Sequence, residues 1–493
     1  MLEQICKDLE MSENVRGNLI ALRQEIKDED TLAAWKAYHK EHAVLYTFLF
    51  DEDPKVRKNA ALILGSTEGN AAVQALYDAY EVESTLFVRS AYIKAMEGLE
   101  LGGCLGKLKQ RLERLLEMQP EKEEQKHYHA EVHGLITLIR ANEKPIKHRF
   151  VGYDVPLDIL LTTMPGYQSA TARQCIHDKP VVVPVGVKLH TAHLGELVHL
   201  RTFHELLITL DGNNHIKGTH EEIAEEILNT NLMSLLTTLH EGDGMFPFRM
   251  EVKGAISADK RNEILHRVAE QLEQKSGYRL FNTTGDYELE IRLIVNRDKS
   301  FCPILKLFTL PLHRFSYRKR SVAASIHPAV AALLMQLAEP YLKEGARVLD
   351  PFCGVGTMLI ERDMMTPAGE LYGTDIFGEA IEKGRENAQA AGEKINFINR
   401  NFFDFTHEQL FDEMVTNMPM RGKMEKEEHD QLYADFFARA GQLLKPGSII
   451  VMYSNEEGFV KKQLRLHKEY VLKQENLIRQ NDRSYLFVIS YKG

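Results

Sequence analysis

Apolar residues recur at helical spacing through the first 145 residues, which are rich in Ala, Leu, Glu and Lys and poor in Gly and Pro. We therefore predict an all-helical region over residues 1–145. Beyond it the pattern changes to short apolar runs separated by turn-forming residues, with helical spacing at 257–275. This mixture predicts an α+β region, of one domain or two, over residues 147–312. The runs expected to form strands are 158–163, 181–185, 204–210, 247–252 and 287–295.

From residue 323 onward, apolar runs alternate with amphipathic helical segments. A helix at 328–342 leads into a strand at 347–350. Such alternation is typical of a doubly wound sheet, so residues 313–493 are expected to form an α/β, Rossmann-like domain. Three regions agree with the usual domain size for a chain of 493 residues. The further strands expected here are 370–374, 395–398, 414–417, 448–453 and 484–491.

The helical region contains a repeat. Asp51-Glu-Asp-Pro-Lys-Val-Arg57 is echoed by Glu83-Ser-Thr-Leu-Phe-Val-Arg89, so that Val-Arg recurs after 32 residues. Asp-Pro before Val-Arg resembles the HEAT repeat, in which helix pairs stack into a solenoid. A generic helical bundle is the alternative. The region carries no catalytic motif, and we expect it to serve as an interaction or packing surface. A protein is the candidate partner for it.

The strand at 347–350 leads into Asp350-Pro-Phe-Cys-Gly-Val-Gly-Thr357, a loop with two glycines followed by a helix. Glycines let a ligand approach the backbone closely, and a carboxylate placed before them suits a ligand ammonium group. Acidic residues also follow the next two strands, where they could accept hydrogen bonds from ribose hydroxyls and from an adenine amino group. The predicted cofactor-binding residues are Asp350, Pro351, Cys353, Gly354, Gly356, Thr357, Asp375, Ile376, Asp404 and Asn417. The order of these residues predicts a methyltransferase that uses S-adenosylmethionine.

The fourth strand of this region ends in Asn417-Met-Pro419-Met420. This resembles the [Asp/Asn]-x-Pro-[Tyr/Phe] motif of methyltransferases that act on exocyclic amines of bases. The Asn oxygen and a backbone carbonyl can accept the two N–H groups of such an amine and orient it for methyl transfer. Asn417, Pro419 and Met420 are the predicted catalytic residues. Met420 replaces the aromatic residue that stacks on the base.

Charge and composition limit the possible binding partners, metal sites and cellular location. The formal net charge is −10, which disfavours nucleic acid unless basic residues cluster locally. Such a cluster is predicted to bind RNA: Arg314, Tyr317, Arg318, Lys319 and Arg320. A solvated interdomain linker is the alternative. The five cysteines form no C-x-x-C pair, so we expect no metal site. Without a signal sequence or a long apolar run, a cytoplasmic protein with no membrane partner is expected.

From about Lys147 to its end, the chain resembles the THUMP-domain-containing RNA methyltransferases. The matching segments, in order, are Leu160-Leu-Thr-Thr-Met-Pro-Gly166, Leu197-Val-His-Leu-Arg201, Phe248-Arg-Met-Glu-Val252, His313-Arg-Phe-Ser-Tyr-Arg318, and Asp350 to Thr357. The resemblance implies a ferredoxin-like and THUMP RNA-binding region before the catalytic domain. It also implies formation of N2-methylguanosine, with tRNA as the expected substrate.

Two other functions are compatible with the residues. The Asn-x-Pro motif also serves methylation of adenine N6 and of protein glutamine, and Met420 makes a base-stacking site less specific. The other alternative is a scaffold without catalysis, in which a HEAT-like region is joined to a cofactor-binding domain.

Overall fold

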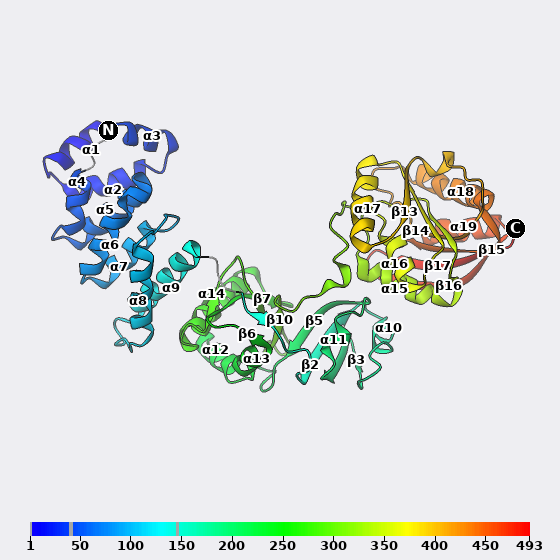
Figure 1. Ribbon diagram of the computed structural model, residues 1–493, viewed down its shortest axis with the longest axis horizontal. Coiled ribbons are helices and arrows are strands. Elements are labelled where there is room, and N and C mark those ends of the chain that lie inside the picture. The colour runs from blue at the N-terminus through cyan, green and yellow to red at the C-terminus, as the bar shows by residue number, and fades with distance from the viewer. Residues whose placement is uncertain (1, 39–42, 144–146) are drawn as a thin grey trace. The chain divides into compact units, whose positions relative to one another are not determined.

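Figure 1 shows the computed structural model, which describes residues 2–38, 43–143 and 147–493. The chain folds as two compact units. The first comprises Met1–Lys147 with Leu272–Leu280, and the second comprises His148–Gln271 with Phe281–Gly493. The units divide between Lys147 and His148, and residue 312 lies within the second unit. The division into three domains stays a prediction. No helix among the described residues is long and apolar enough to span a membrane.

The first unit is helical up to residue 143, as the periodicity predicts. The repeated sequence begins helices α5 and α7, which pack against each other. Val56 and Val88 are buried at equivalent places, and Arg57 forms a bidentate ion pair with Glu83 at 2.8 Å. The repeat therefore builds the core of this region. Its helices are α1 (Leu2–Glu10), α2 (Val15–Glu25), α3 (Glu29–Tyr38), α4 (Ala43–Thr47), α5 (Pro54–Thr67), α6 (Val73–Val82), α7 (Leu86–Ala95), α8 (Cys104–Leu116) and α9 (Gln125–Asn142).

The middle of the chain forms one continuous eight-stranded sheet in the order β3-β4-β2-β5-β10-β9-β7-β8. Strands β5 and β10 pair antiparallel and join its two halves, while β7 and β9 pair in parallel. The strands are β2 (Leu157–Thr163), β3 (Val181–Val183), β4 (Gly186–Thr191), β5 (Phe203–Thr209), β7 (Phe246–Lys253), β8 (Leu280–Asn282), β9 (Leu289–Val295) and β10 (Phe301–Leu307). The helices are α10 (Gln168–Ala172), α11 (Leu194–Leu197), α12 (His220–Leu228), α13 (Leu232–Leu239) and α14 (Ala258–Lys275), and β1 (Arg149–Phe150) pairs with β6 (His240–Glu241).

The C-terminal domain is the predicted α/β sheet, in the order β13-β12-β11-β14-β15-β17-β16, with β17 antiparallel to both neighbours. The chain winds outward from β11 in one direction through β12 and β13, and in the other through β14 and β15. The carboxyl ends of β11 and β14 therefore form a topological switch point, where open α/β sheets bind ligands. The strands are β11 (Arg347–Asp350), β12 (Glu370–Asp375), β13 (Ile395–Asn399), β14 (Phe411–Asn417), β15 (Leu444–Ser454), β16 (Tyr470–Arg479) and β17 (Ser484–Tyr491).

Helices cover both faces of this sheet (Figure 1), and alternate strand residues face different helical layers. Val348 and Val415 belong to a core cluster with residues of α15, α16 and α17. Leu349 and Met414 belong to a second cluster with residues of α18 and α19. This double burial explains the nearly continuous apolar character of the central strands. The helices are α15 (Pro328–Ala338), α16 (Thr357–Met365), α17 (Gly378–Ala391), α18 (Lys426–Leu443) and α19 (Glu457–Leu466).

Candidate active site

Asp350 ends β11 at the switch point and is 1% exposed. One carboxylate oxygen, Oδ1, accepts a hydrogen bond of 3.1 Å from the Phe352 amide. Burial raises the pKa of Asp350 to about 8, and the neighbouring Asp375 charge adds to the rise. A buried carboxyl group of this kind favours a cationic ligand, because a positive charge would stabilise its ionised form.

The loop after β11 is held by the next strand. Asp375, at the end of β12, accepts hydrogen bonds from the Gly354 amide at 2.8 Å and from the Phe377 amide at 2.9 Å. Gly354 and Gly356 have positive φ angles of 50° and 79°, and a Cβ atom on Gly356 would lie 2.7 Å from the Phe397 ring. Gly356 is the N-cap of α16, so the loop delivers the helix N-terminus to the edge of the sheet.

A cavity of about 520 Å³ opens at this edge, a volume within the usual range for small-molecule sites. Most of the predicted cofactor and catalytic residues line it together. They are Asp350, Pro351, Cys353, Gly354, Thr357, Asp375, Ile376, Asn417, Pro419 and Met420. The buried Thr357 Oγ1 has no hydrogen-bond partner among the described residues, so the lining offers a polar group to a ligand. Separate stretches of the sequence therefore meet in one site.

Two predicted cofactor residues lie outside this lining. Gly356 acts through its backbone, as described above. Asp404 ends a 3₁₀ turn at residues 402–404, is exposed, and does not line the cavity. Asn401, Phe402 and Phe403 line the cavity in its place, and the Asn401 side chain caps the turn by accepting from the Phe403 amide at 3.1 Å. This corrects the assignment of Asp404 to an adenine amino group.

The Asn417-Met-Pro-Met420 loop follows β14 and is fixed from two sides. The Met418 amide donates to the Tyr453 carbonyl at 2.9 Å, and Met418 is buried. His429, buried on α18, donates from Nε2 to the Pro419 carbonyl at 2.9 Å. The Asn417 side chain is partly exposed and makes no hydrogen bond to another described residue. Its oxygen and amide are therefore available to a ligand.

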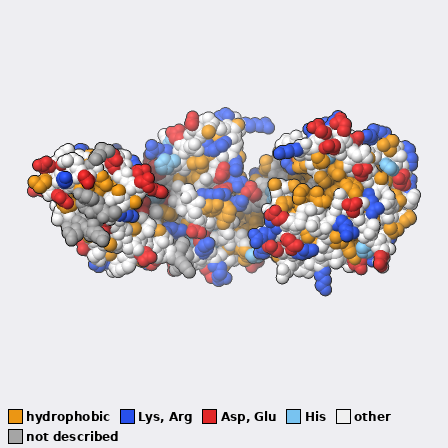
Figure 2. Space-filling view, turned by 90° about the horizontal axis from the view of Figure 1, so that it is seen from above, with side chains coloured by type: hydrophobic (Ala, Val, Ile, Leu, Met, Phe, Trp, Pro, Cys, Tyr) orange, Lys and Arg blue, Asp and Glu red, His pale blue; other side chains and the backbone are white. Residues whose placement is uncertain are grey.

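The cavity opens beside exposed apolar side chains. Ile376, Phe377 and Met420, all in the lining, are 60%, 67% and 62% exposed. Figure 2 shows apolar side chains gathered on the surface of the C-terminal domain. Exposed apolar groups beside the cavity favour a ligand with a flat aromatic part.

The structure divides the predicted RNA-binding cluster. Arg314 is buried and donates to the carbonyls of Phe203 at 2.6 Å and His204 at 2.9 Å, and burial together with Arg201 lowers its pKa to about 10. Tyr317 is also buried, and its hydroxyl donates to Glu361 at 2.6 Å. Neither side chain is available to RNA, so the prediction that Arg314 and Tyr317 bind RNA is wrong.

These two residues instead join the middle sheet to the C-terminal domain, together with the Arg201–Glu361 ion pair at 2.7 Å. The rest of the predicted cluster lies nearer the surface. Arg318 is partly buried and Lys319 is exposed, while Arg320 is paired with Glu386 at 2.8 Å. The exposed positive charge of this connector is therefore smaller than the sequence suggested.

Some residues of the site were not predicted from the sequence. His429 lies outside any motif, and only the packing of α18 brings it to Pro419. Asn401 precedes the predicted Asp404 and could have been chosen from the Asn-Phe-Phe-Asp stretch, since asparagine is a frequent cap. Glu361, which pairs with Arg201 and lies outside the cavity lining, was recognisable only as part of the helix after the glycine loop.

The C-terminal part of the chain is similar in sequence to known methyltransferases. Residues 316–480 match a family model described as UPF0020, RMKL-like, methyltransferase domain. The C-terminal domain has a methyltransferase fold. Over 228 residues the chain is 27% identical to the tRNA (guanine(6)-N2)-methyltransferase of Thermus thermophilus, covering 44% of this chain and 66% of that protein.

A second relative is the tRNA (guanine(10)-N2)-dimethyltransferase of Methanothermobacter thermautotrophicus. It is 29% identical over 156 residues, covering 30% of this chain and 45% of the relative. The chain thus spans less than two thirds of the length of either relative. Among solved structures, the methyltransferase SMU.472 complexed with SAH is similar, with 15% identity and a TM-score of 0.53, over 69% of this chain and 98% of that one. This likeness shows that the middle and C-terminal folds occur together elsewhere.

Proposed function

We propose that the protein is an S-adenosylmethionine-dependent RNA methyltransferase that forms N2-methylguanosine in tRNA. The observation that carries this proposal is the single cavity at the switch point, where Asp350 and Asp375 meet the Asn417-x-Pro419 loop. The two relatives described above are named as guanine-N2 methyltransferases of tRNA, which supports this choice of base and RNA.

The cavity fits the proposed cofactor. The buried carboxylate of Asp350 suits the ammonium group of the methionine part, and Asp375 has lone pairs left for the ribose hydroxyls. Thr357 offers an unpaired buried hydroxyl, and Asn401 with Phe402 offers a polar and an aromatic contact for adenine. When bound, the cofactor supplies an electrophilic methyl group on a sulfonium.

Asn417 would orient the acceptor. A guanine N2 amine has its lone pair delocalised into the ring and is a poor nucleophile. The Asn417 oxygen and a backbone carbonyl of this loop accept its two N–H groups and hold the nitrogen toward the cofactor. Pro419 keeps the loop rigid, and Met420 lies against the base with its thioether in place of an aromatic ring. The amine needs no deprotonation before transfer, and the proton that N2 loses once it carries the methyl group passes to solvent.

The remaining regions fit the same activity. We propose that the eight-stranded sheet contains the ferredoxin-like and THUMP-like modules and binds RNA, with the exposed Lys319 contributing charge. The stacked helices of the first unit, with Val-Arg repeated on α5 and α7, support a HEAT-like solenoid.

The test is methylation by the purified protein. The full chain is incubated with S-adenosylmethionine and an unmodified tRNA transcript, the tRNA is digested, and nucleosides are identified by mass spectrometry. N2-methylguanosine formed by the wild type but not by Asn417→Ala supports the proposal. N6-methyladenosine instead would identify a different exocyclic amine as the acceptor. If cofactor binds but no nucleoside of the tRNA is methylated, the proposal is wrong.

A further inference from the structure

The first unit contains a polar cavity of about 330 Å³ between α6, α7 and α8. Four basic side chains and one acidic side chain line it. Lys107, Arg111 and Arg114 come from α8, where spacings of four and three residues place them on one face of the helix. Arg89 on α7 completes the basic set. This is a concentration of positive charge on a chain whose formal net charge is −10.

The cavity is built on a buried anchor. Glu131 of α9 is 2% exposed and accepts from Arg111 Nε and Nη2 at 3.1 and 3.0 Å, and from the Tyr80 hydroxyl at 2.7 Å. Arg89 lies 3.7 Å from the other Glu131 oxygen. The anchor orients both guanidinium groups, so their side-chain entropy is already lost before a ligand binds.

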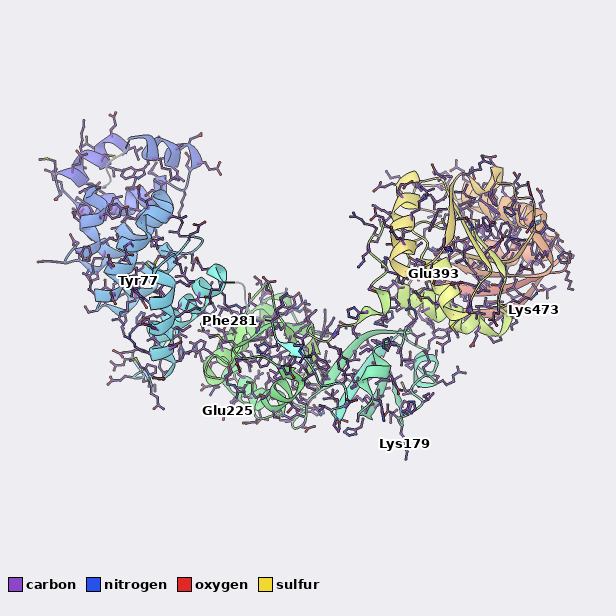
Figure 3. The ribbon with its side chains drawn as sticks, in the orientation of Figure 1. Tyr77, Lys179, Glu225, Phe281, Glu393 and Lys473 are labelled. Carbon is purple, nitrogen blue, oxygen red and sulfur yellow. The ribbon has the colours of Figure 1, made fainter. Side chains whose placement is uncertain are left out.

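The other two basic side chains of the cavity, Lys107 and Arg114, are its outer cations and lie nearer the surface. Lys107 and Arg114 are exposed and form no ion pair among the described residues. Lys107 Nζ lies 5.0 Å from the centre of the Tyr77 ring, which Figure 3 labels within the first unit. From Lys107 to Arg114 the helix rises about 10 Å, enough to meet more than one phosphate of a nucleic acid strand.

We propose that this cavity binds backbone phosphates of the RNA substrate, an inference that rests on the proposed function. Arginine predominates among its cations, and the planar fork of the guanidinium group matches phosphate oxygens. The predicted basic connector also loses Arg314 to internal hydrogen bonds and Arg320 to Glu386. The connector keeps the exposed Lys319 and the partly buried Arg318, and this cavity adds further cations from the helical unit.

The test compares two double variants of the full chain. Lys107→Gln with Arg114→Gln removes the outer cations and leaves the Glu131 anchor intact. Lys7→Gln with Lys55→Gln removes two exposed charges of the same unit that lie outside the cavity lining. Binding of a labelled tRNA transcript is measured by fluorescence anisotropy between 50 and 200 mM salt, and binding of S-adenosylhomocysteine is measured in parallel.

Each phosphate contact adds about 0.7 to the slope of log affinity against log salt for a single strand. The cavity variant should therefore show a slope smaller by about 1.4. Its loss of affinity between 50 and 200 mM salt should be about sevenfold smaller than that of the wild type. The control variant should keep the wild-type slope, and S-adenosylhomocysteine should bind equally well to all three proteins.

An unchanged slope in the cavity variant overturns the inference. So does capture of a labelled glutamate-rich peptide by the cavity with no effect on tRNA, which would assign it to a protein ligand. Failure of the proposed function is distinguishable, because it would appear as absent methylation by the wild type. Methylation with a slope that is independent of Lys107 and Arg114 would reject the phosphate site alone.

Discussion

The buried carboxyl group of Asp350 should make cofactor binding depend on pH. Its pKa is raised to about 8 in the unliganded protein, so most of it is protonated at pH 7. A ligand ammonium group beside it favours the ionised form and lowers that pKa. Binding below pH 8 must therefore release a proton, and affinity should fall about tenfold for each pH unit below this value.

The measurement is calorimetry with S-adenosylhomocysteine from pH 6.0 to 7.5, in buffers that differ in ionisation enthalpy. In this range the α-amino group of the ligand stays largely protonated, since its ordinary pKa lies near 7.7–8.0. The wild type should gain about 25-fold in affinity across the range and release close to one proton near pH 6.5. The matched control is Asp350→Asn, which keeps the shape of the side chain but cannot titrate.

Asp350→Asn should bind more weakly at pH 7.5 and show little pH dependence. If wild type and variant have the same pH profile, then Asp350 does not titrate on binding and the reasoning is refuted. A wild-type affinity that rises as the pH falls would refute it as well.

Three further changes test other parts of the site. Asn417→Ala should lower kcat by about 10²–10³, because it removes one oriented hydrogen-bond acceptor, while the Kd for S-adenosylhomocysteine stays within twofold; an unchanged kcat contradicts the role of Asn417. His429→Phe leaves the Pro419 carbonyl without its donor and should lower kcat about tenfold with little change in KM. His429→Gln should restore part of the rate, and equal effects of the two variants would indicate a packing role alone. Glu361→Gln weakens the buried pairing with Arg201 and should cost about 3 kcal/mol in urea unfolding of the full chain; a change below 0.5 kcal/mol would show that the pair adds little.

The pattern of apolar and polar residues was sufficient to predict much of the C-terminal fold. The strand at 347–350 and the last strand at 484–491 have the predicted bounds, because both are apolar runs buried on two faces. The helix predicted at 328–342 ends at Ala338, and a 3₁₀ turn containing Pro340 follows it. Proline cannot continue the hydrogen-bonding pattern of a helix, so the sequence contained the reason for this shorter helix.

Some strands could not be recognised from pattern. β16 contains Lys473, Gln474 and Glu475 and lies at the sheet edge, where one side faces solvent and apolar runs are not required. β10 lies inside its sheet although it contains Pro303. Proline lacks the amide hydrogen of the ladder and argues against a central strand. Tertiary pairing with β9 overrides that local preference.

The residues of the site also divide into those that the sequence pattern could predict and those that it could not. Asp350, Asp375 and Asn417 could be chosen because parallel strands bring their carboxyl ends to one edge, a rule that needs only the strand order. Asp404 was wrongly assigned to the adenine amino group because it lies in a single 3₁₀ turn, where successive side chains point in different directions. Arg314 and Tyr317 were misassigned because the sequence reveals their charge and polarity but not their burial, which depends on partners more than 40 residues away.

The central claim is tested most directly in cells. Nucleosides from purified tRNA and ribosomal RNA are compared by mass spectrometry between cells that contain the protein, cells that lack it, and cells that carry only Asn417→Ala. We expect N2-methylguanosine to be lost from tRNA in the second and third cases and restored by the wild-type chain. An unchanged nucleoside profile in both RNA fractions would contradict the account.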